Sequence, residues 1–237
     1  MSQAPRRPVA MVTAASQGIG LAIAEELAQR GYAVSLLART DRVLLEAERL
    51  GGMGTIGSVA IPDDLAKFHA ATVARFGAVD AVVNNTGHPP KGDLLDISDE
   101  DWRSGADLIL LNVIRLARLV VPGMKVKKKG AFVNVSAFAA ESPDLAYPVS
   151  STLRAGLTAF TKLFAQRYAA EGIRMNAVLP GFVDSYPVDA ARVASIPMGR
   201  YGRVGELAQT VAYLLSDESS YVTGQSILVD GGMVRSV

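Results

Sequence analysis

The run Thr13-Ala14-Ala15-Ser16-Gln17-Gly18-Ile19-Gly20 joins two segments of different periodicity. Before it, residues 8–13 form a short apolar stretch. After it, residues 21–30 place apolar side chains at a helical period, and the pattern ends at Gly31. Glycines in a turn of this kind let the backbone bend tightly and approach a pyrophosphate, which then lies at the positive end of the helix dipole. The stretch predicts a strand, a phosphate-binding turn and a helix, although a Gly-rich turn alone is a weak signal.

The same alternation of strand and helix continues to the end of the chain. Further strands are predicted over residues 33–38, 55–60, 78–83, 131–135, 174–179 and 226–229, and further helices over residues 41–50, 63–76, 101–125, 150–171 and 206–216. Such alternation is typical of a parallel sheet with helices on both faces. No linker or internal repeat interrupts it. The sequence therefore predicts one α/β domain over residues 1–237, a Rossmann-type, doubly wound sheet of seven parallel strands.

Composition and charge exclude several classes of function. The chain has no cysteine, which excludes disulfides, thiolate metal sites and a cysteine nucleophile, and no metal site is expected. No apolar stretch approaches the ~18 to 20 residues that cross a bilayer, and residues 1–8 lack the features of a signal peptide. We therefore expect a cytoplasmic protein without a membrane partner.

A nucleic-acid partner is not expected either. The formal net charge is only +1, and the densest basic run, residues 125–129, ends a predicted helix where positive charge complements the helix dipole. No aromatic residues interleave with the lysines, as a base-stacking surface would need.

Several later motifs stand in a fixed order behind the Gly-rich turn. Asn84-Asn85-Thr86-Gly87 follows the fourth predicted strand, Pro180-Gly181 follows the sixth, and residues 221–232 end the chain with Tyr-Val-Thr-Gly-Gln and Val-Asp-Gly-Gly. Together these motifs resemble the short-chain dehydrogenase/reductase family, and within it the β-ketoacyl-carrier-protein reductases. The first glycine of the family's turn is Ala14 here. The resemblance implies an oxidoreductase that binds a nicotinamide dinucleotide and a small-molecule substrate.

The resemblance also implies which residues hold the cofactor. NAD-preferring relatives present an acidic side chain at the end of the second strand, whereas Arg39 stands there and suits the 2′-phosphate of NADP(H). NADP(H) is therefore expected in preference to NAD(H), although Gln17 lacks the second positive charge of many NADP binders and Ser58 replaces an adenine-binding aspartate. The other interpretation of Arg39 is a surface arginine. The expected cofactor-binding residues are Thr13, Ser16, Gln17, Gly18, Ile19, Gly20, Arg39, Ser58, Val59, Asn85, Thr86, Gly87, Arg154, Pro180, Gly181 and Val183.

The family's catalytic pair is absent from this chain. Carbonyl reduction in the family uses a tyrosine acid and a lysine four residues later, a spacing that places both on one helix face. None of the seven tyrosines has a lysine four residues after it. The family run Tyr-x-x-x-Lys-Ala-Gly-Leu is matched by residues 150–157, which begin with Ser150 and carry Arg154 at the lysine position.

The two helper positions are also altered. The family serine, thirteen residues before the tyrosine, maps to Ala137, and Ser136 falls one place early, which on a strand would turn it to the opposite face. The helper asparagine maps to Ile109, with Asn112 one turn later. All four standard catalytic positions therefore differ from the family pattern.

Serine is a much weaker acid than a phenol of pKa about 10, and its side chain is shorter, so another proton donor is needed. The candidates are Tyr147 near the start of the helix, His88 directly after the Asn-Asn-Thr-Gly turn, and a water relayed through Ser150. The competing interpretations are an ordinary loop histidine, a tyrosine that packs at the pocket rim, and a polar helix face for Ser150 and Arg154. The candidate catalytic residues are Ser150, Arg154, Tyr147, Ser136 and His88.

Two hypotheses follow. The chain is either an oxidoreductase that moves a hydride between NADP(H) and a small carbonyl or alcohol through a non-standard site, or a pseudoenzyme that binds a dinucleotide or small ligand as a sensor or partner-binding module. The substrate cannot be identified, since the expected covering loop, residues 184–203, carries no diagnostic motif. A homotetramer is expected, because helices 101–125 and 150–171 carry extra apolar residues and their family equivalents pair between subunits. These residues are Leu108, Leu111, Phe160, Leu163 and Phe164.

Overall fold

The computed structural model describes residues 6–235, and its centre is one sheet of seven parallel strands. The strand order is β3-β2-β1-β4-β5-β6-β7, which confirms the predicted fold class. The strands are β1 (Val9–Thr13), β2 (Ala33–Ala38), β3 (Met53–Ile56), β4 (Ala81–Asn84), β5 (Gly130–Val135), β6 (Ile173–Pro180) and β7 (Ser226–Val229).

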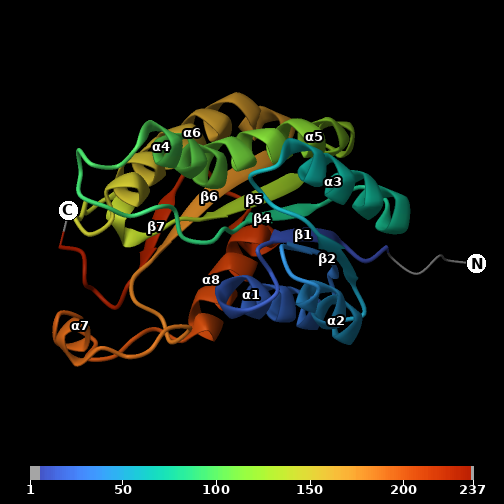
Figure 1. Cartoon of the computed structure of the whole chain (residues 1–237). Helices are drawn as coiled ribbons and strands as arrows, with labels where there is room; N and C mark the ends of the chain where they lie inside the picture. The colour runs from blue at the N-terminus through green and yellow to red at the C-terminus, as the bar shows by residue number, and fades with distance from the viewer. Residues whose placement is uncertain (1–5, 236–237) are drawn as a thin grey trace, which may run out of the picture.

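Helices cover both faces of the sheet (Figure 1). One face carries α1 (Gly18–Gln29), α2 (Arg42–Arg49) and α8 (Val204–Leu215), and the other carries α3 (Pro62–Phe76), α4 (Asp99–Ala106), α5 (Asn112–Lys127) and α6 (Pro148–Tyr168). Every residue of β1, β2, β4 and β5 is buried, as expected for strands covered on both faces. The apolar core accordingly divides into two clusters, one on each side of the sheet.

The strand order places a crevice at the C-terminal ends of β1 and β4. β1 pairs with β2 on one side and with β4 on the other, so the chain reverses its direction of winding between them. In open α/β sheets such a switch point leaves a crevice outside the carboxyl ends of the strands, and ligands bind there. The predicted phosphate-binding turn and the Asn-Asn-Thr-Gly turn follow these two strands, and both therefore border this crevice.

Several predicted bounds differ from the structure by one to three residues, among them the start of β4 and both ends of α6, and two predicted elements differ more. The strand predicted over residues 55–60 is β3, which ends at Ile56, because Ser58 begins a turn in which its Oγ accepts a hydrogen bond from Ala60 N at 3.2 Å. The helix predicted over residues 101–125 is divided by a π-helical turn, Asp107–Leu111, between α4 and α5. Asn112 follows that turn, and its side-chain amide donates a hydrogen bond to Leu108 O within the helix. Asn112 does not line the cavity of the candidate site. Ile109 is buried in the core.

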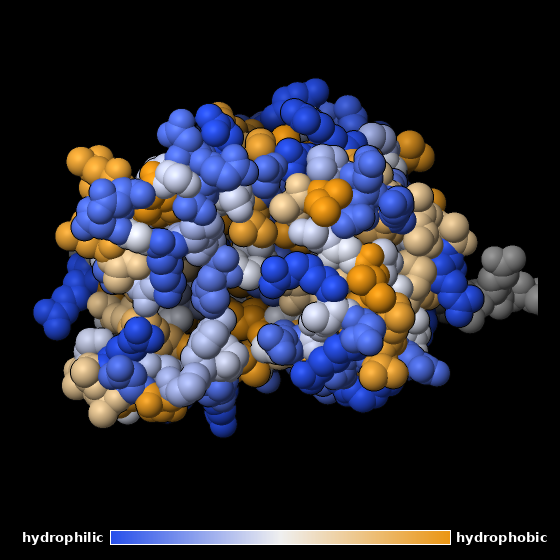
Figure 2. Space-filling view, viewed as in Figure 1, coloured by the Kyte–Doolittle hydropathy of each residue, from blue (hydrophilic) through white to orange (hydrophobic). Residues whose placement is uncertain are grey.

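The loop expected over residues 184–203 contains a short helix, α7 (Ala190–Ala194), which Asp189 caps by accepting hydrogen bonds from two backbone amides. Its ribbon projects from the sheet in Figure 1, but its side chains contact the strand ends, since the Arg192 guanidinium lies 4.8 Å from the centroid of the Phe182 ring. In the space-filling view, hydrophilic residues cover much of the same face, and hydrophobic ones show between them (Figure 2). No helix within residues 6–235 is both long and apolar enough to cross a bilayer.

The residues expected to mediate association divide between core and surface. Phe164 is buried and contacts Phe132 edge-on, with 5.3 Å between the ring centroids, so it belongs to the core and not to a free face. Leu108 and Phe160 also pack against the core, whereas Leu163 is 63% exposed. The homotetramer stays a prediction.

Candidate functional site

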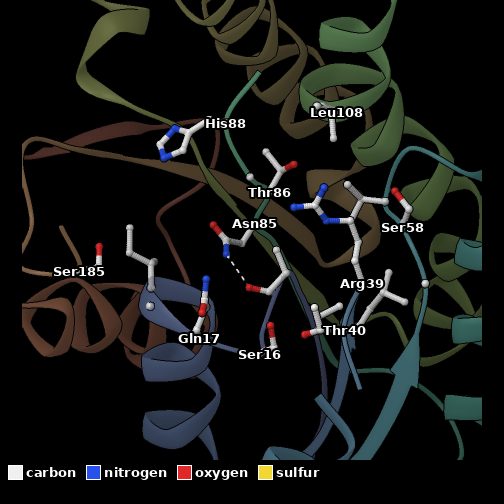
Figure 3. A pocket seen from close by; sticks show the side chains of 18 of the residues that line it. Ser16, Gln17, Arg39, Thr40, Ser58, Asn85, Thr86, His88, Leu108 and Ser185 are labelled. Atoms are coloured by element: carbon white, nitrogen blue, oxygen red, sulfur yellow. Dashed lines mark hydrogen bonds between the residues drawn. The ribbon is translucent and has the colours of Figure 1, made fainter. Parts of the chain in front are cut away.

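A cleft of about 500 Å³ opens at the C-terminal ends of β1, β2 and β4. Figure 3 shows side chains that line it, with Ser16 and Gln17 from the turn before α1, Arg39 and Thr40 after β2, and Asn85 and Thr86 after β4. Ten expected cofactor-binding residues line this cleft, namely Ser16, Gln17, Gly18, Ile19, Arg39, Ser58, Val59, Asn85, Thr86 and Gly87.

The Gly-rich turn has a shape that few side chains permit. Ala14 adopts φ +49°, a left-handed conformation that costs a residue with a Cβ about 1 kcal/mol and that the family's glycine would adopt freely. A Cβ added to Gly20 would lie 2.3 Å from Ala14 O, so only glycine lets helix and turn approach this closely. Gln17 precedes α1 and forms no side-chain cap, and the first helical turn holds no acidic residue. The amides of this helix end are thus free to bind an anion.

Thr13 and Gly20 do not line the cleft but lie behind the residues that do. Thr13 is buried, its Oγ1 donates to Asn85 O at 2.6 Å, and it accepts from Asn85 N at 2.9 Å. The Asn85 amide in turn donates to Ala14 O at 3.2 Å, the dashed line in Figure 3. These bonds tie the Gly-rich turn to the Asn-Asn-Thr-Gly turn, so Thr13 holds the two turns together behind the cleft wall.

Arg39 is an exposed cation at the edge of the cleft. Its Nη2 lies 4.0 Å from the place where a Cβ on Gly87 would sit, so the guanidinium reaches across from the β2 side toward the β4 side (Figure 3). Within residues 6–235 it forms no ion pair with any carboxylate, so it is available to an anionic ligand. Ser58 also lines the cleft, but its hydroxyl is engaged by Ala60 N.

A second cavity, of about 390 Å³, adjoins the cleft. Ile19, Asn85, Thr86, Gly87, His88 and Tyr186 line both spaces. All five candidate catalytic residues line the cavity, and so do Pro180, Gly181 and Val183. Helix α6 and the cleft at the ends of β1, β2 and β4 therefore meet in one place, as the resemblance implies.

Arg154 lies in the wall of this cavity and is only 7% exposed. Its Nε donates to Ser150 Oγ at 3.1 Å and its Nη1 donates to Val135 O at 2.9 Å. Burial lowers the pKa of Arg154 from its ordinary value to about 10. The Ser150–Arg154 pair keeps the one-face geometry of the family's Tyr–Lys pair, but with a hydroxyl and a cation that both point into hydrogen bonds of the protein itself.

Ser136 lies closer to the site than the strand register suggested. β5 ends at Val135, so the alternation of faces no longer holds beyond it, and Ser136 and Ala137 both line the cavity. The Ser136 hydroxyl is buried and has no hydrogen-bond partner within residues 6–235. The expectation that the one-residue shift turns Ser136 away from the site is corrected.

The sequence pointed to His88, but its partner Tyr186 was missed. His88 Nε2 and the Tyr186 hydroxyl lie 2.6 Å apart, and their ring centroids are 5.4 Å apart. Partial burial, with smaller contributions from the charges of Lys91 and Arg154, lowers the pKa of His88. The imidazole is therefore neutral at pH 7 and can exchange a proton with the phenol. Since the two residues are 98 positions apart, no local spacing could have revealed the pair.

Tyr147 lies at the cavity rim, directly before α6. The Lys91 ammonium sits 4.8 Å from the centroid of its ring, a cation–π contact that fixes both side chains. This agrees with the interpretation of Tyr147 as a residue that packs at the rim.

Replacing Arg154 by methionine is expected to raise the free energy of unfolding by about 2 kcal/mol. Folding lowers the pKa of the Arg154 guanidinium, so the buried charge destabilises the folded state at every pH below about 10. This destabilisation fades only as the pH rises above 10 toward the ordinary arginine value. The shift corresponds to about 3 kcal/mol, and loss of the bond to Val135 O offsets about 1 kcal/mol of it. Urea unfolding at neutral pH measures the change. Arg167→Met, at an exposed site on the same helix, should stay within about 0.5 kcal/mol of the unmutated protein. A less stable Arg154→Met protein would contradict the expectation.

Comparisons with known proteins agree with this geometry. The family model described as enoyl-(acyl carrier protein) reductase matches residues 13–234. The chain is 34% identical over 235 residues to the 3-oxoacyl-acyl-carrier-protein reductase FabG of Vibrio cholerae, covering 95% of this chain and 96% of that one. The FabG of Thermotoga maritima is also 34% identical, over 239 residues, with 95% and 97% covered.

A solved structure is similar over its whole length. L-Sorbose reductase from Gluconobacter frateurii, complexed with NADPH and L-sorbose, superposes with a TM-score of 0.93 at 28% identity, and all of both chains is covered. These relatives are oxidoreductases. The match to the family model, the sequence identity and the structural similarity show that the chain belongs to the short-chain dehydrogenase/reductase family.

Proposed function

We propose that this protein is an NADP(H)-dependent oxidoreductase that acts on a small carbonyl compound or alcohol through a non-standard active site. The proposal rests on one observation: the cleft and the second cavity adjoin each other and share six lining residues. A cleft with a free helix N-terminus and a free Arg39 adjoins a cavity that holds polar and titratable side chains. Ligands in the two spaces would be in contact, as hydride transfer requires.

The residues of the cleft fit a dinucleotide. The free amides at the start of α1 suit its pyrophosphate, Arg39 suits a 2′-phosphate, and Gly20 keeps the turn open to close approach. Pro180, Gly181 and Val183 line the neighbouring cavity, where the nicotinamide end is expected. When bound, NADPH supplies the hydride for the carbonyl carbon and becomes NADP⁺.

The proton for the carbonyl oxygen is assigned in this proposal to the His88–Tyr186 pair. Tyr186 is a phenol, the same kind of acid that the family uses, and it borders both the cleft and the cavity. His88 holds its hydroxyl at 2.6 Å and can return the proton from solvent. Ser150 is a poorer donor than Tyr186, since an aliphatic hydroxyl is a much weaker acid than a phenol.

Turnover tests the proposal directly. The protein is mixed with NADPH and a panel of small ketones, aldehydes and oxo acids, while nicotinamide absorbance is followed and NADPH binding is titrated in parallel. Binding with slow oxidation that depends on the carbonyl compound supports it.

A second candidate function rests on the hydrogen bonds of Arg154. Ser150 and Arg154 are engaged with each other and with the backbone, an arrangement that a ligand-binding pseudoenzyme could keep without any chemistry. NADPH binding without oxidation by any member of the panel would favour this pseudoenzyme, a sensor or partner-binding module. Absence of NADPH binding would contradict the oxidoreductase and leave only a pseudoenzyme that binds another small ligand.

For the cofactor, NADPH is expected to bind about tenfold more tightly than NADH. A guanidinium–phosphate pair contributes about 1.5 kcal/mol at an exposed position such as that of Arg39. Arg39→Asp should erase or reverse the preference, since its carboxylate repels the 2′-phosphate and accepts a hydrogen bond from a ribose hydroxyl. Fluorescence titrations of both cofactors measure it, with Arg42→Ala, which removes an exposed arginine nearby, as the control. Equal affinities in the unmutated protein would show that Arg39 does not bind the phosphate.

A further inference from the structure

We propose that the second cavity takes a small carboxylate-bearing carbonyl compound, an oxo acid, whose carboxylate is held by Arg154. The inference rests on the proposed function and names its substrate class. The cavity wall holds a buried cation, Arg154, for which the described residues provide no counter-ion.

Arg154 is only 7% exposed. Its two hydrogen bonds within residues 6–235 go to a neutral hydroxyl and a neutral carbonyl. Burying a charge without a partner is costly, and proteins keep such a group mainly where a ligand or a function compensates. Burial also lowers the pKa of Arg154, but only to about 10, so the guanidinium is still charged at pH 7. A cation in this position creates a site for an anion.

The other charged groups of the cavity have the same sign. Lys91 and Arg192 line it and are exposed, and His88 is the remaining basic group. Among the described residues that line it, there is no aspartate or glutamate. Asp144 and Asp189 line a neighbouring pocket and not this cavity. Asp189 accepts from the amides of Ala191 and Arg192, and Asp144 accepts from Ala146 N.

The rim cations are held in place by aromatic rings. Lys91 lies 4.8 Å from the centroid of Tyr147, and the Arg192 guanidinium lies 4.8 Å from the centroid of Phe182. Charges of one sign at the mouth of a low-dielectric cavity attract ions of opposite sign and raise their local concentration. The buried Arg154 and the two rim cations therefore form a path of positive charge from solvent to the cavity wall.

The hydrogen-bonding capacity of Arg154 favours a carboxylate over a phosphate. Nε and one N–H of Nη1 are used within the chain, and no partner within residues 6–235 takes an N–H of Nη2. The Nη1–Nη2 edge can thus donate two parallel hydrogen bonds to one carboxylate. One buried cation balances one negative charge, whereas a phosphate monoester carries up to two. Phe182 stacks on Tyr201 and contacts Phe138 at a tilted angle, and these three rings line the same cavity and suit a short apolar remainder.

Equilibrium binding to the full chain, in the presence of saturating NADP⁺, tests the inference. The probes are oxo acids of two to six carbons, their neutral methyl esters, and phosphate monoesters of similar size, measured by calorimetry. The acids are expected to bind at least tenfold more tightly than the esters. Arg154→Met should remove this difference, a loss of about 10- to 100-fold in acid affinity, and leave ester affinity unchanged. Arg154→Lys should keep part of it, and Arg167→Met, on the same helix but paired with Glu171, should keep all of it.

The outcomes separate this inference from the proposed function. Equal binding of acids and esters, no acid binding across the panel, or an acid preference that survives Arg154→Met would overturn the inference and leave NADPH-dependent turnover of neutral carbonyls standing. Tighter binding of phosphate monoesters than of acids would overturn the carboxylate assignment. Acid binding that depends on Arg154, without any NADPH oxidation, would support the ligand class and contradict the oxidoreductase. Loss of folding in Arg154→Met is checked by the unfolding curve, in which this variant is expected to be the more stable one.

Discussion

Tyr186→Phe is expected to lower the rate of NADPH-dependent carbonyl reduction by about 100-fold, because it removes the proposed proton donor. The substitution deletes one oxygen and keeps the ring, so its contact with His88, at 5.4 Å between centroids, is preserved. The affinity for NADPH should change little. Steady-state rates at saturating NADPH measure the effect, and a titration of NADPH confirms that the cleft is intact.

Tyr147→Phe is the matched control, because it deletes the same atom from another tyrosine of the same cavity. Its effect should stay within about threefold, since the contact with Lys91 involves the ring face and not the hydroxyl. His88→Ala should lower the rate less than Tyr186→Phe, because solvent can replace the relay but not the donor. If Tyr147→Phe or Ser150→Ala removes the activity while Tyr186→Phe retains it, the donor is one of these residues and the Tyr186 assignment is wrong.

The pH dependence follows from the same pair. In alcohol oxidation the proton leaves through Tyr186 to His88, which must be neutral to accept it. Burial and the charges of Lys91 and Arg154 lower the pKa of His88 below its ordinary 6.5. The oxidation rate should therefore hold as the pH falls through 6.5 and decline only below it, as the imidazole becomes charged.

The fold was predictable from the sequence because its signals are local. β2 and β7 have the predicted bounds, since each is a short apolar run bounded by turn residues. The predicted end of β3 was wrong because Ser58 begins a turn in which its hydroxyl accepts a hydrogen bond from Ala60 N. Hydrophobic periodicity does not predict such a bond. The π-helical turn at Asp107–Leu111 was likewise invisible, because its apolar pattern also fits an ordinary helix.

The residues of the site likewise fall into those that local motifs predict and those that only tertiary contacts place. The cleft residues come from turns directly after strands, so motif order placed most of them correctly, while the burial of Thr13 depends on a bond to Asn85 across the sheet. The contact between His88 and Tyr186 depends on how the loop after β6 folds over the strand ends. The burial of Arg154 depends on packing of α6 against β5. A helical arginine four residues after a serine looks like a solvated face, and only the tertiary structure shows it to be an uncompensated cation.

The replaced residues of α6 lead to the prediction with the largest expected gain. Ala137, Ser150 and Arg154 line one cavity, and Ser150 and Arg154 share one helix face with a 3.1 Å bond between their side chains. These three positions therefore lie together in the structure, as the resemblance implies for the family's serine, tyrosine and lysine. The phenol of the family's tyrosine is replaced by the Ser150 hydroxyl, and its lysine is replaced by an arginine that donates to Ser150 and to Val135 O.

Ala137→Ser, Ser150→Tyr and Arg154→Lys together are expected to raise the rate of reduction of simple neutral ketones by about 10²- to 10⁴-fold, the range that a positioned general acid supplies. Each single change should do little, because the tyrosine needs the lysine charge to act as an acid and the serine to orient the carbonyl. The matched control carries phenylalanine at position 150 in the same triple background, which keeps the ring and removes only the acid. NADPH oxidation with a ketone panel measures both proteins, and titration with NADPH verifies binding. A folded triple variant that binds NADPH yet reduces ketones no faster than its phenylalanine control would mean that the cavity does not hold a carbonyl against the cofactor. The pseudoenzyme would then be the better account of the site.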